Sequence, residues 1–173
     1  DRIGRDLRQL AVSIAASTEN VEQWRTFCEE KGGIFPLLET IREGARSIQE
    51  ETANSNTVSE TAWLGWLDHQ EEVFQGACSA CRVLRDVCAI SPEVSVVITD
   101  GILRTNAAWE GALLDDMRIM LQYANEYDTA TSVSNRRRDR RDGRLRYKLY
   151  VTQLLLAMTV ASDDAVAAIR ATD

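Results

Sequence analysis

The feature that most constrains the fold is a segment that recurs along the chain. The segments "CRVLRDVCAISPEVSVVITDGIL" (81–103) and "TQLLLAMTVASDDAVAAIRATD" (152–173) fit one template when Ser91 is aligned with Ser162. A weaker third copy, "LRQLAVSIAASTENVEQW", lies near the start. Its Ser17 precedes Ser91 by 74 residues, and Ser91 precedes Ser162 by 71. A near-constant period is typical of stacked structural repeats, so we predict a repeat fold.

Amino-acid usage predicts that the repeating units are helical. Hydrophobic residues make up 45% of the chain and charged residues 27%, a balance typical of folded domains. Proline occurs only twice, and Ala, Leu, Glu and Arg are frequent, which favours helices over strands. The 173 residues contain no apolar run of about 18 residues, so no membrane span is expected. We predict an all-α fold in which residues 1–173 form a single helical region.

Apolar residues at helical spacing indicate where the long helices lie. Between Ile34 and Ile48, apolar residues recur at steps of three and four, with Pro36 in the first turn, where its missing N–H costs little. Two further stripes have this spacing: Ala77, Cys81, Leu84 and Cys88, and then Leu113, Met117, Met120, Leu121 and Ala124. A helix expected at 144–161 is apolar over most of its circumference, so we expect it to have neighbours on more than one side.

Capping residues predict short helices between the long ones. Asn20, Ser91 and Ser162 are N-cap types, and each stands just before an acidic first turn. The glycines at 32–33 and Gly101 are expected to end these helices, because glycine is the preferred residue just beyond a helix C-terminus.

Two segments lack apolar periodicity and are predicted to be inserted loops. They are residues 51–60, rich in Asn, Ser and Thr, and residues 128–143. Without them, each unit would shorten toward the 40 to 47 residues, roughly, of known two- and three-helix repeats. The last residues stop where the earlier copy reads "TDGIL", so we expect a window from a longer chain whose next residue is Gly. No targeting peptide is visible at the start.

The stretch "VLRDVCAISPEVSVVITDGIL" resembles the junction between two armadillo repeats, and "EKGGIFPLLETI" resembles the passage into the next long helix. The residues at the corresponding positions are Val83, Leu84, Asp86, Val87, Ser91, Glu93, Ile98, Gly101 and Leu103. HEAT-like repeats are a near alternative. The resemblance implies a right-handed α-solenoid of about two to three armadillo-like repeats with long inserted loops. It also implies a rigid surface that binds another macromolecule.

One departure from the armadillo pattern bears on function. In the peptide-binding branch of that family, Asn residues on successive third helices hold the backbone of an extended peptide. This chain has Asp86 at that position in one unit and Ala157 in the next. A carboxylate cannot donate a hydrogen bond to a carbonyl oxygen, and alanine can neither donate nor accept one. Peptide recognition of the nuclear-import type is therefore not expected.

The strongest local charge lies in "RRRDRRDGRLRYK", residues 136–148, with eight basic and two acidic residues, a net +6 against −13 for the rest of the chain. It predicts an electrostatic patch for an acidic protein, a lipid headgroup or nucleic acid. The alternative is a solvated segment that pairs with the chain's own acids. A pI near 4.9 argues against a dedicated nucleic-acid binder. The candidate binding residues are Arg136, Arg137, Arg138, Arg140, Arg141, Arg144 and Asp86.

The cysteines offer two interpretations. Cys78, Cys81 and Cys88 form C-x2-C-x6-C, and a zinc site would need a fourth ligand such as Cys28 or His69. The three clustered cysteines lie inside a predicted helix, so packing as small apolar residues is the favoured interpretation. No disulfide scaffold is indicated, which favours a reducing, intracellular compartment, cytoplasmic or nuclear, with organelle import left open.

Little in the sequence indicates catalysis. His69 is the single histidine, and there is no Gly-rich phosphate loop, G-x-S-x-G or H-E-x-x-H motif. Trp63 and Trp66 lie on one side of a predicted helix, where packing is favoured over an exposed interface role. We therefore predict a protein that is not an enzyme and uses no cofactor or metal.

The leading functional prediction is a non-catalytic protein–protein interaction scaffold or adaptor, a structural subunit of a larger assembly. The partner is another protein, with an acidic surface if it binds the Arg-rich segment. The alternative is a nucleic-acid-associated helical repeat that binds through residues 136–148.

Overall fold

A computed structural model describes residues 21–30, 33–54, 60–126 and 135–172. All regular elements within these ranges are α-helices, which confirms the predicted all-α class. They are α2 (Val21–Glu29), α3 (Phe35–Asn54), α4 (Glu60–Cys88), α5 (Pro92–Ala108), α6 (Ala112–Glu126), α7 (Asn135–Ala161) and α8 (Asp163–Arg170).

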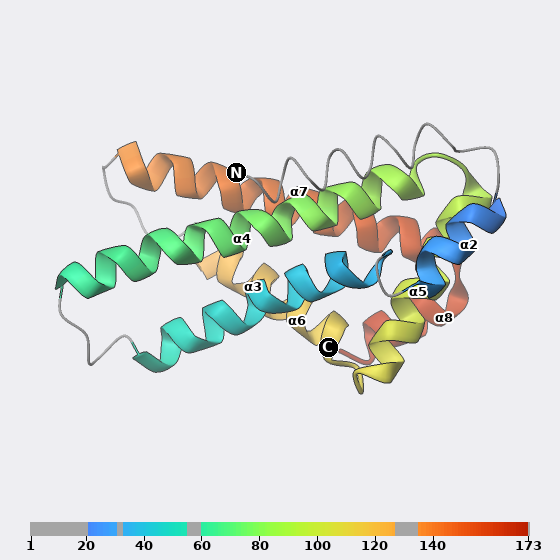
Figure 1. Ribbon diagram of the computed structural model, residues 1–173, viewed down its shortest axis with the longest axis horizontal. Helices are drawn as coiled ribbons and strands as arrows, with labels where there is room; N and C mark the ends of the chain where they lie inside the picture. The colour runs from blue at the N-terminus through green and yellow to red at the C-terminus, as the bar shows by residue number, and fades with distance from the viewer. Residues whose placement is uncertain (1–20, 31–32, 55–59, 127–134, 173) are drawn as a thin grey trace.

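The long helices form a bundle that the shorter helices close at one end. In Figure 1, α3, α4 and α7 run roughly along the long axis of the molecule, while α2, α5 and α8 gather at the right-hand end. Helix α3 packs against α4, and α4 packs against α7. The arrangement buries the apolar faces of the long helices against one another.

Each helix also packs on the third helix that follows it. Helix α2 packs on α5, α3 on α6, α4 on α7, and α5 on α8. The recurring sequence segments correspond to the passages α4–α5 and α7–α8, so the packing follows the same order as the sequence recurrence.

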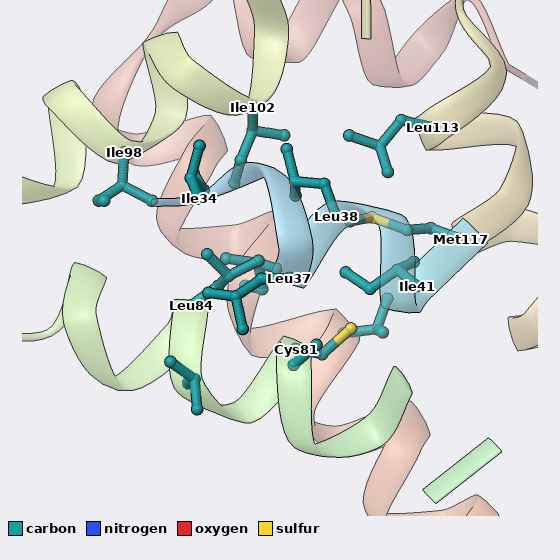
Figure 2. Packing of buried hydrophobic residues seen from close by; sticks show 14 of the residues in the cluster. Ile34, Leu37, Leu38, Ile41, Cys81, Leu84, Ile98, Ile102, Leu113 and Met117 are labelled. Carbon is teal, nitrogen blue, oxygen red and sulfur yellow. The ribbon is translucent and has the colours of Figure 1, made fainter. Parts of the chain in front are cut away.

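The core joins the apolar stripes that helical spacing predicts. Ile34, Leu37, Leu38 and Ile41 are almost fully buried, and Figure 2 shows them surrounded by side chains of α4, α5 and α6. The facing residues labelled there are Cys81, Leu84, Ile98, Ile102, Leu113 and Met117. The predicted stripes on 34–48 and from Ala77 to Cys88 are therefore confirmed as core-facing at their described positions.

Gly101 does not end a helix, contrary to the prediction. It lies in the interior of α5, which runs without interruption to Ala108. A Cβ atom at this position would lie 3.0 Å from Sγ and 3.1 Å from Cβ of Cys28 on α2. The glycine is therefore explained by the close approach of α2 to α5, a tertiary requirement that local sequence does not reveal.

Both predicted loops are shorter than expected. Helix α3 continues to Asn54 and α4 begins at Glu60, so the two ends of the segment 51–60 are helical. Helix α7 begins at Asn135, so residues 135–143 of the predicted loop 128–143 are also helical. Residues 135–143 are helical because they are rich in arginine, a good helix former, and because they lead directly into the part of α7 that packs against the core. Residues 55–59 and 128–134 lie outside the described part of the chain.

The caps of the short helices differ from one another. Ser91 is the N-cap of α5, and its Oγ accepts a hydrogen bond from the N–H of Val94 at 3.2 Å. Hydrogen bonds from its own backbone N–H and from Ser91 lower the pKa of the exposed Glu93 carboxyl. Ser162 has N-cap backbone geometry before α8 but makes no side-chain capping hydrogen bond. The predicted cap Asn20 lies outside the described residues.

Candidate interaction surface

Helix α7 has one buried face and one face that carries exposed aliphatic side chains. The buried face consists of Tyr147, Val151, Leu154 and Met158, each fully buried against the core. On the opposite side, Leu149, Leu156 and Val160 expose 51%, 62% and 82% of their surface. We call these three residues the α7 stripe. Their spacing of seven and then four residues places them in one line along the helix.

Leu156, in the middle of the α7 stripe, aligns in sequence with a residue of α4 that contacts another helix. With the 71-residue offset, Leu156 corresponds to Arg85 on α4. Arg85 contacts α7 directly: its guanidinium lies 4.7 Å from the ring centroid of Tyr150, and its Nη1 donates to Oε1 of Gln153 at 2.7 Å. Arg82, which corresponds to Gln153, lies 5.9 Å from the same ring. Leu156 is thus the counterpart of a residue that packs on another helix, whereas Val160 corresponds to the exposed Ala89, just beyond the end of α4.

Asp86 lies in the last turn of α4, beside this contact. Its carboxylate forms ion pairs with Arg85 and, at 3.7 Å, with Arg82, and its side chain is half-exposed. The predicted binding residue is therefore engaged by two guanidinium groups of its own helix. Ala157, at the corresponding position on α7, is partly buried against the core.

The six predicted arginines lie on the first turns of α7. The backbone of Arg136, Arg137, Arg138, Arg140, Arg141 and Arg144 belongs to this helix, and their side chains lie outside the described part of the structure. Arg146, in the next turn, has a described and exposed side chain. The basic segment is therefore the start of the same helix that carries the α7 stripe.

The carboxyl of Asp116, on α6, is a buried polar group inside the bundle. Asp116 is only 8% exposed, and its Oδ2 lies 3.9 Å from Nε of Arg42 on α3 without forming a hydrogen bond. The Arg42 guanidinium also lies 4.7 Å from the ring centroid of Trp109, which makes an edge contact with Phe35. Arg42 thus joins a buried carboxylate to an aromatic pair at the α3–α6 contact.

Burial raises the pKa of Asp116 to about 6, and this has a defined effect on stability. Arg42 and Arg46 lower the pKa, whereas Asp115 raises it. The charge of Asp116 in turn adds to the elevation of the Tyr147 pKa, whose main cause is burial of the hydroxyl. Between the unfolded value of 3.8 and about 6, the folded chain binds more protons. The contribution of Asp116 to stability is therefore highest below pH 4 and is lost as the pH rises through 6.

The substitution Asp116→Asn is expected to remove the loss of stability that Asp116 causes as the pH rises through 6. We expect the variant to be close to the wild type near pH 4 and more stable at pH 7 by on the order of 1–3 kcal/mol, because it buries no charge. Urea unfolding at a series of pH values measures the difference. A difference that stays constant between pH 4 and pH 7 would contradict the expectation. Asp100→Asn, at an exposed carboxyl of α5, is the matched control.

The cysteines lie where core packing requires small apolar residues. Cys81 and Cys88 are buried on α4, and burial raises the pKa of the Cys88 thiol to about 11. Burial also raises the pKa of Cys28 to about 12, and that of Cys81 still further. Burial of this kind is typical of cysteines that pack as small apolar residues. Among the residues that the structure describes, no three potential metal ligands come together.

The structure describes the side chain of one more tryptophan, Trp24, but not those of the candidates Trp63, Trp66 and His69. Trp24 is 1% exposed and makes an edge contact with Phe27, as core packing requires. The side chains of Trp63, Trp66 and His69 lie outside the described residues, and the predictions for them stay predictions.

The α7 stripe is the surface feature that the sequence does not predict. Its signal was present, because Leu156 belongs to a helix that is apolar around most of its circumference. At the 71-residue offset, Leu156 aligns with Arg85 and Val160 aligns with Ala89. The second copy therefore carries larger aliphatic side chains at these two positions than the first. The pattern could not show which side of the helix the fold leaves open.

None of the helices in the described ranges combines the length and apolarity that a membrane crossing requires. Comparison of the chain with protein-family models, with curated proteins and with solved structures finds no match. The resemblance to armadillo repeats therefore stays a prediction from the sequence.

Proposed function

We propose that this chain is a non-catalytic interaction scaffold, built as an armadillo-like α-solenoid, that holds another protein through the outer face of α7. The observation that carries the proposal is the α7 stripe, in which three aliphatic side chains of one helix are at least half-exposed. Aliphatic surface of this kind in a continuous line is typical of a helix that receives a partner.

Two further observations support a solenoid. Helices pack on their counterparts three positions later, from α2 on α5 to α5 on α8. The sequence recurs with the same order of elements. In a solenoid each unit presents its outer helix to the next layer, so an interaction surface on α7 is expected from the architecture.

The second candidate function is nucleic-acid binding through the basic start of α7. The observation that favours it is the continuity of α7, which places six arginines on a regular helix rather than in a loop. Phosphate contacts made by arginines would weaken steeply with salt. The exposed aliphatic stripe on the same helix favours a protein partner instead.

One experiment separates these two functions. The full-length protein is used for affinity capture from its native cells, with and without nuclease. The variants are Leu156→Glu and the reversal of Arg136, Arg137, Arg138, Arg140 and Arg141 to Glu. We expect a set of proteins that survives nuclease, is lost with Leu156→Glu and is retained after the arginine reversal. Gln122→Glu, an exposed charge change on α6, is the matched control.

The opposite pattern would support the second candidate. Capture that needs intact nucleic acid and the five arginines, and that Leu156→Glu leaves unchanged, would contradict the scaffold proposal. The same capture repeated at rising salt measures the number of phosphate contacts.

A further inference from the structure

We propose that the partner on the α7 stripe is a second copy of this chain, whose α7 packs antiparallel on the first. The inference rests on the proposed function, because it names the occupant of the same surface. It makes the chain a self-associating scaffold in which two solenoids join through their α7 helices.

The stripe is complementary to itself in an antiparallel arrangement. If two α7 helices cross near the midpoint between Gln153 and Leu156, Leu149 of one copy faces Val160 of the other. Leu156 then lies against the side-chain stem of Gln153, which is also exposed on this face. Each aliphatic residue of the stripe then has an apolar neighbour in the other copy. A two-fold interface requires this, because the same surface of both copies must be complementary to itself.

Charges at the two ends of the stripe favour this orientation. Arg146 is exposed one turn before Leu149, and Asp163 and Asp164 are exposed at the start of α8, just beyond Val160. The antiparallel register that joins Leu149 to Val160 also brings the Arg146 end of one stripe toward the end of the other stripe, where the chain passes from α7 into the acidic start of α8. A parallel pair would place Arg146 against Arg146, and carboxylates against carboxylates. Charge pairing therefore selects the antiparallel pair.

The helix-packing chemistry at this surface is already present once within the fold. The corresponding face of α4 receives α7 through Arg82 and Arg85, which contact Tyr150 and Gln153. On α7 the equivalent positions carry Gln153 and Leu156. On α7 the aliphatic side chain of Leu156 therefore stands where α4 has the guanidinium of Arg85. An aliphatic side chain packs well against other aliphatic side chains, so the α7 stripe suits a second α7 stripe rather than an aromatic ring.

The expected association is weak. The stripe from Leu149 to Val160 extends about 16 Å along the helix. This is short of a standard protein interface, so the dissociation constant is expected in the range of about 10 to 100 µM. Sedimentation equilibrium between about 1 and 300 µM covers this range. The weight-average mass should rise with concentration from the 19.4 kDa monomer toward twice that value.

Charge reversal provides the decisive test. We expect Leu156→Glu to leave a monomer, and Arg146→Glu or Asp163→Lys/Asp164→Lys to raise the dissociation constant at least tenfold. The combination of all three charge reversals in one chain should restore the dimer, because glutamate of one copy then meets lysine of the other. Circular dichroism on each variant confirms that the exposed substitutions leave the fold intact. Gln122→Glu is again the control and should dimerise like the wild type.

The outcomes that overturn the inference are specific. A wild-type chain that stays monomeric at the highest concentration excludes the second copy. A dimer that Leu156→Glu leaves unchanged places the interface elsewhere, and a combined variant that fails to recover excludes the antiparallel register. If the chain is monomeric but Leu156→Glu still abolishes capture of another protein, the second copy is excluded and the proposed scaffold function is retained.

Discussion

Replacing Leu38 by Ala is expected to lower the free energy of unfolding by about 2–5 kcal/mol. Leu38 is completely buried, and Figure 2 places its side chain near Ile102 of α5 and Met117 of α6. Three helices line the space that the removed methyl groups would leave, so the site cannot collapse without moving a helix. Urea unfolding followed by circular dichroism measures the loss.

Leu149→Ala is the matched control for this substitution. It removes the same atoms from a side chain that is 51% exposed, and it should change the free energy of unfolding by no more than about 0.5 kcal/mol. Equal losses from both variants would contradict the packing of α3 at the centre of the core. A large loss from Leu149→Ala alone would mean that the α7 stripe is buried in solution.

Gly44→Ala is expected to destabilise the chain by about 1–3 kcal/mol, although alanine is the better helix former. Gly44 is buried on α3, where an added Cβ would lie 2.8 Å from Cε of Met120 and 2.9 Å from Cβ of Ala77. The methionine can change rotamer, but Cβ of Ala77 is fixed to the backbone of α4. The two helices would have to separate, which disturbs the packing along both.

Gly76→Ala separates crowding from helix propensity. Gly76 is a buried glycine on α4, and an added Cβ would meet only Cγ2 of Thr40, at 3.3 Å. This variant should lie between neutral and about 1 kcal/mol more stable than the wild type, the gain from replacing glycine in a helix interior. If thermal unfolding shows equal effects for the two variants, the close approach of α3 and α4 is wrong.

The parts of the fold that could be predicted are those that depend on a single helix. Stripes such as Ala77 to Cys88 are visible in the sequence because one face of a helix must be apolar. Ser91 is a recognisable cap because its side chain bonds within its own turn. The prediction that Gly101 ends a helix is wrong for the opposite reason. Its role depends on Cys28 of a distant helix, and local spacing cannot distinguish a helix end from a helix crossing.

The site was harder to predict than the fold. The Arg-rich segment is conspicuous in the sequence because of its charge, whereas the exposed surface that the structure describes on the same helix consists of three aliphatic residues. Aliphatic residues are the expected content of a core, so Leu156 and Val160 are conspicuous only after the fold shows that they face outward. Asp86 is a candidate only through the family resemblance, and the structure shows its carboxylate paired with Arg82 and Arg85 of the same helix.

The packing of each helix on its third successor has a consequence for how the chain opens. Such a structure can open in parts, because the free energy of local opening depends on how much apolar surface each helix buries. Helix α8 buries only Ala165 and rests on α5 and α7. It can therefore detach in a local fluctuation that leaves the rest of the bundle closed, and its amides should exchange with solvent well before those of α3.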